Sequence, residues 1–359
     1  MTYENTLPCS QADAEQFIAN ASALAKRDGI EASLYVPPPS TRLEDVRRLH
    51  SVADELKLEV LQSHSALIGV QHLHHAAAVS RAAEVRRSTL VYTRNLTVML
   101  AALAAGHRVA YEHYRPWPVQ IPPLQPLLRW SMRHPNFVGG ILHSNYARRS
   151  YLELGVAPNK LRTFHNGFDP GRFEPRLTRA EARAATDLQF DGPVIVYTGR
   201  INEKKGLELV LEIAARMPEA NFVLVGSEQQ GCIEAAAAQH ANVHIRPWQR
   251  FEEVTKFLFA ADVLLIPPSM KPLEEFGCTV VPLKLFSYLA AGRAIVAANA
   301  PDVRELLHHD ENAFLLKPDD AERATADLRV LLSDNDRMER LAVPARVVDG
   351  ESSRACRGV

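Results

Sequence analysis

Short apolar runs alternate with helix-like segments along the whole chain. The runs cover residues 31–37, 58–64, 89–94, 108–113 and 139–144, and then 194–199, 221–226, 243–247, 262–268 and 294–299. Between them, segments such as "AEQFIANASALAKRDG", "GLELVLEIAARMP" and "FEEVTKFLFA" repeat apolar residues at three- and four-residue spacing, which predicts amphipathic helices. Apolar runs of this length between helices are typical of buried parallel strands joined by helical crossovers. The pattern therefore predicts an α/β protein.

The two series of strands predict two doubly wound, Rossmann-like sheets. They are separated by residues 166–192, which are rich in proline, glycine and charge and include one helix-like stretch, "TRAEARAA". The predicted domains are residues 1–172 and 173–345, followed by a divergent or truncated tail at 346–359. Ligands bind beyond the carboxyl ends of parallel strands, so two facing sheets would place their functional loops on either side of one central cleft.

The overall composition narrows the class of protein. A length of 359 residues suits two domains, and 41 basic against 42 acidic residues give a formal net charge of -1, which argues against nucleic acid as a partner. The cysteines, Cys9, Cys232, Cys278 and Cys356, form no CxxC pair, so neither a zinc site nor a disulfide framework is expected. We find no signal peptide and no apolar stretch of about 20 residues, which predicts a cytoplasmic protein with at most peripheral membrane contact.

The stretch "VIVYTGRINEKKG" places positive charge where a strand ends and a helix begins. Arg200 follows the strand, Lys205 lies five residues later, and Gly206 lets the backbone approach a ligand closely. A guanidinium, an ammonium and the free N–H groups of a helix N-terminus together suit a diphosphate. A solvated charged turn is the alternative interpretation.

A second candidate loop lies in "FGCTVVPLKLFSYLAAGRAIVAAN". We predict a helix over Leu283–Ala291, with Pro282 at the first helical position and Gly292 ending the helix. Residues 279–283 would then offer N–H donors to a phosphate, and Lys284 would add a positive charge. An exposed helix lysine is the alternative interpretation of Lys284.

These motifs resemble the nucleotide-binding domain of family 4 retaining glycosyltransferases, which have the GT-B fold. The resemblance rests on "YTGRINEKKG", "NFVLVG", "FLFAADVLLIPP", "PLKLFSYLAAGRAIVA" and "VRELLHHDENAFLLKPDD", in the family's order and spacing. The pattern "PLKLFxYLAAG" is similar to that of a variant subgroup. The first half resembles the family less closely, in "VAYEHYRPWP", in "HSNYARRSYLELGVAPNKLRTFHNGFDPGRF" and in an opening segment that looks like a strand, a loop and a helix. The resemblance covers roughly Tyr3 to Leu328.

The resemblance implies a role for the matching residues. Arg200 and Lys205 would hold the pyrophosphate of a nucleoside diphosphate sugar and stabilise the leaving diphosphate. The cleft histidine of the family corresponds to His113, which could bond the transferred sugar or receive charge from the acceptor, while Glu112 could orient that ring or face solvent. The donor-binding residues implied are Gly199, Arg200, Lys205, Pro247, Trp248, Thr279, Val280, Val281, Lys284 and Ser287.

One departure from the family concerns the ribose site. Many members carry two glutamates eight residues apart, and the corresponding positions here are Thr279 and Ser287. Ser287 could hydrogen-bond a ribose hydroxyl, and Glu275 or Glu274 from a lengthened loop is the alternative for that role. Ser10, in the opening loop, is a further candidate site residue.

Two other segments have less specific interpretations. The tetrapeptide "HLHH" at residues 72–75 predicts a helix surface, and no carboxylate or cysteine pattern supports a metal site there. Residues 113–134 combine five prolines, two tryptophans and several basic residues. This composition suits an acceptor-binding lid or a surface that rests on an anionic membrane, and a proline-rich excursion packed on the domain is the simpler alternative.

The resemblance implies a retaining, metal-independent hexosyltransferase that moves a sugar from a nucleoside diphosphate sugar to an acceptor hydroxyl. No cofactor is expected, because Arg200, Lys205 and a helix N-terminus would do the work of a divalent cation. The acceptor would be a glycan, a lipid-linked compound or a small molecule in polysaccharide, glycolipid or glycoconjugate synthesis, with any membrane contact at the inner face. The alternatives are a nucleotide-sugar epimerase on the same fold and a catalytically inactive sugar-nucleotide-binding protein.

Overall fold

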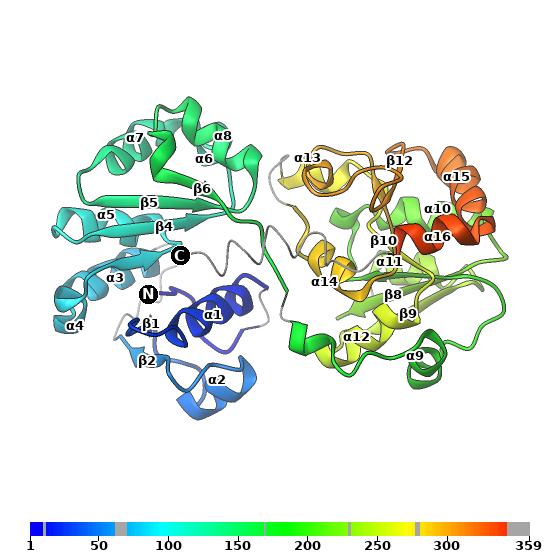
Figure 1. Ribbon diagram of the computed structural model, residues 1–359, viewed down its shortest axis with the longest axis horizontal. Coiled ribbons are helices and arrows are strands. Elements are labelled where there is room, and N and C mark those ends of the chain that lie inside the picture. Colours follow the sequence, from blue (N-terminus) through cyan, green and yellow to red (C-terminus); the bar gives the residue numbers. More distant parts are fainter. Residues whose placement is uncertain (10–11, 62–69, 169, 229–230, 277–280, 343–359) are drawn as a thin grey trace. The chain divides into compact units, whose positions relative to one another are not determined.

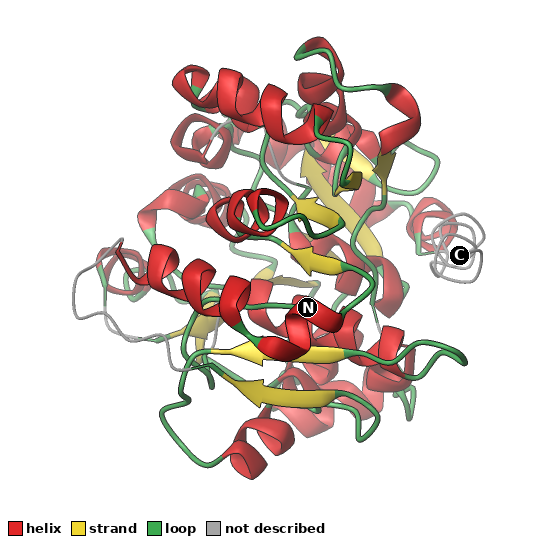
Figure 2. Ribbon diagram, turned by 90° about the vertical axis from the view of Figure 1, so that its left-hand side faces the viewer, coloured by secondary structure: helices red, strands yellow, loops and turns green. Residues whose placement is uncertain are grey.

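The computed structural model describes residues 1–9, 12–61, 70–168, 170–228, 231–276 and 281–342. The chain divides into two compact units, unit 1 (Met1–Thr163) and unit 2 (Phe164–Val359) (Figure 1). The sequence places this division nine residues later, at 172/173. Residues 164–172, between the two boundaries, contact unit 2, because His165 Nε2 lies 2.6 Å from Glu305 Oε1. Figure 2 shows the strands lying between layers of helices.

Unit 1 is a parallel α/β structure. Its helices are α1 (Ala12–Ala25), α2 (Leu43–Leu49), α3 (Val70–Arg81), α4 (Ala83–Arg87), α5 (Leu96–Ala104), α6 (Trp117–Gln120), α7 (Gln125–Arg133) and α8 (Asn145–Glu153). Its strands are β1 (Ser33–Val36), β2 (Lys57–Val60), β3 (Val91–Thr93), β4 (Val109–His113), β5 (Phe137–Leu142) and β6 (Leu161–Thr163).

The strands of unit 1 form two groups that the N-terminus joins. β1 pairs with β2, and β3, β4, β5 and β6 follow one another in a second group, with every pair parallel. Between β1 and β3, Tyr35 N donates to Met1 O at 2.9 Å and Thr2 N donates to Tyr92 O at 3.2 Å. The opening strand expected from the resemblance is therefore reduced to a bridge at Thr2.

Unit 2 contains a larger parallel sheet. Its helices are α9 (Arg179–Thr186), α10 (Leu207–Arg216), α11 (Cys232–Ala237), α12 (Phe251–Ala260), α13 (Lys271–Phe276), α14 (Leu283–Ala291), α15 (Ala321–Ser333) and α16 (Asn335–Leu341). Its strands are β7 (Val194–Thr198), β8 (Asn221–Ser227), β9 (Val243–Pro247), β10 (Val263–Leu265), β11 (Ala294–Ala298) and β12 (Phe314–Leu316).

The strand order of unit 2 is that of a Rossmann fold. The sheet runs β9-β8-β7-β10-β11-β12, so its strands lie in the order 3-2-1-4-5-6 when they are numbered within the unit. All residues of β7, β10 and β11 are buried, which explains why these strands read as continuous apolar runs rather than alternating ones. The order reverses between β7 and β10, and this is the position at which such sheets bind ligands. The predicted α/β fold with two Rossmann-like domains is thus confirmed.

Most predicted elements are present, with corrections at the ends of helices and in short strands. Helix α14 has the predicted bounds, and Gly292 ends it with φ +63°. Pro282 is the N-cap rather than the first helical residue. The strands β6 and β12 were not predicted, because three residues carry too little periodicity. The segment interpreted as a lengthened loop contains the helix α13.

Helix α3 contains "HLHH" as predicted, but the interpretation of this tetrapeptide as a helix surface is wrong for one residue. His75 is only 1% exposed, and its Nε2 lies 2.5 Å from Thr2 Oγ1. The Thr2 hydroxyl gives the His75 ring a hydrogen-bond partner, so this side chain can be buried against the sheet instead of facing water.

The proline-rich residues 113–134 fold into the end of β4, α6, a 3-10 turn and α7. The prolines lie in the first turns of these short helices, where a missing N–H costs nothing. No helix in the described ranges combines the length and the apolar character that crossing a bilayer requires.

Candidate functional site

Two loops of unit 2 meet where its strand order reverses. One follows β7 and runs from Gly199 to Gly206, and the other follows β10. A Cβ atom on Gly206 would lie 2.5 Å from Ser269 Cβ, and Gly206 has φ +68°, so only glycine permits this approach. The sequence motif "GRINEKKG" therefore lies between the end of a strand and the start of a helix, as predicted, at the edge where sheets of this kind bind ligands.

Three cationic side chains, from Arg200, Lys205 and Lys284, gather beside Gly199. A Cβ atom on Gly199 would lie 3.0 Å from Lys284 Nζ, which shows how closely this ammonium from α14 approaches the end of β7. Burial lowers the pKa of Lys205, and the Arg200 guanidinium lowers it further. Burial also holds the pKa of Lys284 well below its ordinary value, and Lys205 adds to that effect. The three cations therefore lie within electrostatic reach of one another.

The surroundings of these cations favour an anionic ligand. Lys284 Nζ lies 3.6 Å from the centre of the Tyr197 ring, which stabilises a cation without neutralising it. Arg200 Nε lies 3.5 Å from Glu228 Oε2, in an exposed pair that contributes little. Repulsion among the three cations is relieved when an anion with several oxygens binds between them, and a diphosphate has that chemistry.

Two buried tyrosines, which no sequence pattern singles out as site residues, fix the shape of this strand end. Tyr197 Oη donates to Arg200 O at 2.9 Å, which closes the turn after β7. Thr198 N donates to Tyr288 Oη at 2.9 Å, and Tyr288 Oη also lies 3.4 Å from Leu265 O at the end of β10. Tyr288 thus ties α14 to both strands of the switch point. Both tyrosines stand inside the quoted motifs, but nothing in the sequence shows which partners their hydroxyls have.

The other predicted donor-binding residues that the structure describes lie on separate elements of unit 2. Pro247 pairs with Ser227 at the end of β9, and Trp248 N donates to Ser227 O at 2.8 Å. The Trp248 side chain is 53% exposed, which leaves an aromatic face open. Val281 is buried just before α14, so its main chain alone can serve a ligand, and Ser287 is partly buried within α14.

Some predicted residues are not placed by the structure. Ser10, Thr279 and Val280 lie outside the described residues, as does the side chain of Glu275. Glu274 is exposed on α13.

In unit 1, His113 is the last residue of β4 and is 4% exposed. Its ring centre lies 4.1 Å from that of Trp117 in an edge-on arrangement. Burial lowers the pKa of His113 to about 3, and His143, Arg115 and Arg94 lower it in addition. The imidazole is therefore neutral near pH 7 and offers one donor and one acceptor.

Glu112 neither faces solvent nor orients His113. Its fully buried carboxylate accepts hydrogen bonds from the Tyr92 hydroxyl and the Arg94 guanidinium, and His143 Nε2 lies 2.7 Å from Oε1. Arg94 and His143 are not among the predicted site residues, because they are separated by 49 residues and meet only through the order of β3, β4 and β5.

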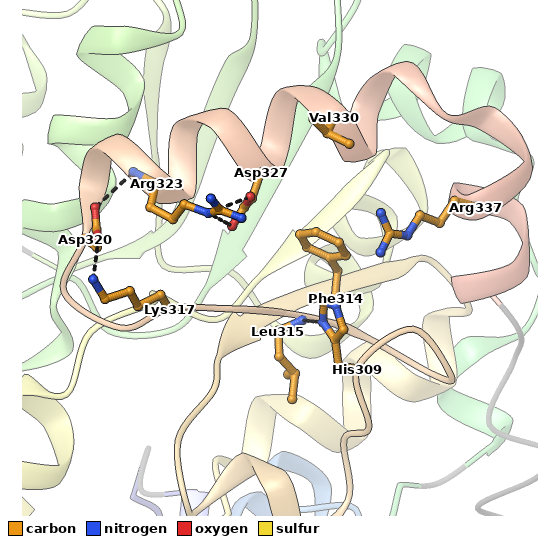
Figure 3. Close-up of a pocket in the computed structure, with 9 residues that line it drawn as sticks. All are labelled: His309, Phe314, Leu315, Lys317, Asp320, Arg323, Asp327, Val330 and Arg337. Atoms are coloured by element: carbon orange, nitrogen blue, oxygen red, sulfur yellow. Dashed lines mark hydrogen bonds and ion pairs between the residues drawn. The ribbon is translucent and has the colours of Figure 1, made fainter.

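A pocket of about 680 Å³ lies elsewhere in unit 2, against β12, α15 and α16 (Figure 3). Asp320 accepts hydrogen bonds from Lys317 Nζ and from the main chain of Arg323, both at 2.9 Å. The Arg323 side chain lies 3.0 Å from Asp327. These charges compensate one another, so the pocket lacks the mutual repulsion found at the switch point. Among the described residues, no cluster of three His, Cys, Asp or Glu side chains could hold a metal ion.

Residues 178–347 match the family model of the group 1 glycosyl transferases. The match covers most of unit 2 and just under half of the chain. Among curated proteins, the sulfoquinovosyl transferase SQD2 of Arabidopsis thaliana is 26% identical over 196 residues, which are 53% of this chain and 37% of that protein. The chain thus spans well under half the length of the curated relatives it matches first.

Solved structures share the whole two-domain GT-B fold with the chain. Anabaena Alr3699/HepE in complex with UDP and glucose has a TM-score of 0.71 at 16% identity, over 99% of this chain and 97% of that one. The UDP-GlcNAc 2-epimerase of Neisseria meningitidis bound to UDP-GlcNAc has a TM-score of 0.64 at 14% identity, over 96% and 95%. At these identities, the likeness to transferase and epimerase alike shows the fold alone.

Proposed function

We propose that the chain is a retaining glycosyltransferase that moves a hexosyl group from a nucleoside diphosphate sugar to an acceptor hydroxyl. The observation that carries the proposal is the group of Arg200, Lys205 and Lys284 at the switch point of unit 2, whose repulsion an anion relieves. The group 1 match covers the same unit. The relative SQD2 is named as a transferase, and the Alr3699/HepE structure holds UDP and glucose, which supports a nucleoside diphosphate as that anion.

The proposed mechanism places positive charge where negative charge develops. As the bond between the anomeric carbon and the diphosphate breaks, Arg200 and Lys205 stabilise the leaving diphosphate, and Lys284 adds a third charge. The acceptor oxygen attacks the anomeric carbon from the face that the diphosphate leaves, which retains the configuration. A departing phosphate oxygen takes the acceptor proton. Because side chains supply the compensating charge, we expect activity without a metal ion or cofactor.

The remaining donor-binding residues complete this proposal. The Trp248 ring and the main chain at Pro247 serve the base, and Ser287 serves the ribose. Gly199 and the main chain of residues 279–281 serve the phosphates, as the resemblance implies. His113 bonds the transferred sugar as a neutral imidazole. A glycan, a lipid-linked compound or a small molecule remains the proposed acceptor, and the cytoplasm the proposed compartment.

We also propose a peripheral contact with an anionic membrane through α6 and α7 of unit 1 (Figure 1). Four large apolar side chains in this segment are 38–53% exposed: Val119, Ile121, Leu127 and Trp130. Residues 113–134 carry Arg115, Arg129 and Arg133 and no acidic residue. Apolar side chains flanked by arginines are the chemistry that inserts into an anionic interface.

A nucleotide-sugar epimerase is the second candidate, because the Neisseria enzyme shares the fold over nearly the whole chain. The experiment incubates the purified chain with UDP-, GDP- and ADP-sugars, each with and without a panel of acceptors. We expect nucleoside diphosphate release that depends on an acceptor, a product with the anomeric configuration of the donor, and a rate unchanged by EDTA.

Three outcomes contradict parts of this proposal. Formation of a donor epimer without acceptor would make the chain an epimerase. Tight nucleotide binding with neither transfer nor hydrolysis would make it an inactive binding protein. Loss of activity in EDTA, with recovery on addition of one divalent ion, would show that the reaction requires a metal.

A further inference from the structure

Three buried ring nitrogens lack a hydrogen-bond partner at one edge of the sheet in unit 1. They are Nδ1 and Nε2 of His113 and Nδ1 of His143, considered against the part of the chain that the structure describes. His113 and His143 are 4% and 6% exposed. Buried polar groups in native proteins are almost always hydrogen-bonded, so three such atoms in one place indicate a partner that is a ligand.

The sheet brings the two imidazoles together. His113 is the last residue of β4, and its register partner on β5 is Leu142. His143 follows Leu142 directly, so both rings lie at the carboxyl edge of neighbouring parallel strands. The pKa of His113 is lowered first by burial and then by His143, as expected for close neighbours. This edge is where α/β sheets bind ligands.

Glu112 determines which His143 nitrogen is left for a ligand. The carboxylate lies 2.7 Å from Nε2, so this nitrogen carries the hydrogen and donates it. The Arg94 guanidinium also contacts the Glu112 carboxylate and balances its charge. With the hydrogen on Nε2, Nδ1 of His143 has a lone pair and accepts a hydrogen bond.

His113 presents the complementary set of groups. Its ring is enclosed by aromatic neighbours, with ring centres 4.1 Å from Trp117, 5.3 Å from Tyr111 and 5.4 Å from Tyr114. As a neutral imidazole it offers one donor and one acceptor. The two histidines together therefore need two donors and one acceptor from bound substrate, which the transferred sugar at His113 and the acceptor share.

A hydroxyl group both donates and accepts, whereas a phosphate dianion only accepts and could satisfy just one of the three nitrogens. We infer that His143, held by Glu112 and Arg94, is a hydroxyl-binding residue that receives an O–H of a neutral sugar or cyclitol acceptor next to His113. This inference rests on the proposed glycosyl transfer and adds the chemical class of the acceptor group bound by unit 1. Trp117 packs edge-on against His113, so a ligand that reaches this ring displaces the indole.

Two substitutions of His143 separate ligand binding from the contact with Glu112. In His143→Gln, the amide nitrogen can occupy the place of Nε2 and keep the bond to Glu112, while Nδ1 is lost. In His143→Asn, the amide lies near the place of Nδ1 and the contact with Glu112 is lost. Both substitutions preserve the Glu112–Arg94 ion pair, so both variants should fold. Thermal melting tests this expectation.

Steady-state kinetics with varied acceptor give the first readout. We expect His143→Gln to lower kcat/KM for the acceptor about fivefold, the effect of one neutral hydrogen bond. The KM of the nucleotide sugar and the affinity for UDP should stay unchanged. His143→Asn should recover part of the loss. An unchanged acceptor kcat/KM in folded His143→Gln, or an equal change in donor affinity, overturns the inference.

A binding measurement keeps the test independent of turnover. In the full chain with Trp130→Phe and Trp248→Phe, Trp117 is the remaining tryptophan. We expect glucose, mannose, galactose or myo-inositol at millimolar concentrations to change its fluorescence, and inorganic phosphate to leave it unchanged. His143→Gln should remove the response. If no nucleotide sugar is turned over, the proposed function fails, but a sugar response that His143→Gln removes still supports the hydroxyl site. A response to phosphate alone refutes it.

Discussion

The strand ends of unit 1 and unit 2 carry opposite kinds of polar chemistry. In unit 2, burial lowers the pKa of Lys205 and of Lys284, and the positive charge of a neighbour, Arg200 or Lys205, lowers each further. In unit 1, the Glu112 carboxylate and the Arg94 guanidinium form a buried pair, and the imidazole of His113 nearby is neutral. A group of like positive charges favours an anion as ligand, whereas neutral donors and acceptors favour hydroxyls. The same kind of parallel sheet thus carries two different kinds of polar surroundings at its strand ends.

The largest effect is expected from removing a cation in unit 2. Lys205→Ala and Arg200→Ala should each lower kcat about 10²-fold or more, because a preorganised charge next to the leaving group is lost. Their melting temperatures should stay close to that of the wild type, since relieving repulsion among like charges does not destabilise the fold.

Lys204→Ala is the matched control for Lys205→Ala, because Lys204 is the exposed neighbour on the same turn. It should keep nearly full activity. Equal losses of activity in Lys204→Ala and Lys205→Ala would mean that the turn acts only through its overall charge. A specific anion site in unit 2, and with it the contrast with unit 1, would then be contradicted.

Binding of UDP should be linked to protonation of Lys284. Burial and Lys205 lower the pKa of this ammonium, and a bound diphosphate raises it again. Calorimetric titration at about pH 8.5, in buffers of different ionisation enthalpy, should therefore show proton uptake. This proton uptake should disappear in Lys284→Met. The affinity of this variant for UDP should be about tenfold lower than that of the wild type. Equal uptake in the variant and the wild type would assign the proton to another group.

The same lowered pKa predicts the pH dependence of stability. A lysine whose pKa is lower in the folded state destabilises the fold progressively as pH falls from its unfolded value, near 10.5, toward its folded value. Lys284→Met should flatten the unfolding free energy over this range. A profile with the same slope as the wild type would contradict the assignment.

A smaller effect is expected at the ribose site. Ser287 offers one neutral hydrogen bond, worth about 1 kcal/mol, so Ser287→Ala should weaken donor binding about fivefold. Ser287→Glu should tighten it, because a carboxylate bonds a hydroxyl more strongly. Weaker binding in both Ser287→Glu and Glu275→Gln would move the ribose contact to Glu275.

The smallest effect should occur at the apolar surface of unit 1. Trp130→Ser should lower partitioning onto vesicles of anionic phospholipid about fivefold. The Trp130 side chain is half-exposed, so only the exposed part of its apolar area can be buried in the membrane. Sedimentation with the vesicles measures this. Val330→Ser is the control, since Val330 is exposed on α15 of unit 2. Equal partitioning of the wild type and Trp130→Ser would remove the membrane from the proposed partners.

The sequence by itself determined the parallel α/β architecture and the position of the cationic loop. Buried parallel strands are apolar over their whole length, so runs such as "VIVYTG" are visible without coordinates. The cations of unit 2 stand within the segments that follow β7 and β10, and their distance from a strand end can be counted along the chain. Helix α14 was predictable to the residue because Gly292 supplies the left-handed C-terminal conformation.

Only the tertiary structure decided which distant residues share a partner. The contacts of Glu112 with Arg94 and His143 depend on the order of three strands, and no local pattern encodes a bond between residues 31 positions apart. The same holds for His75, which sits in an ordinary helical sequence but is buried because Thr2 satisfies its ring. The periodicity of the sequence shows which face of a helix or strand is apolar. The partner of a buried polar group depends on which residue lies opposite it, and only tertiary packing determines that residue.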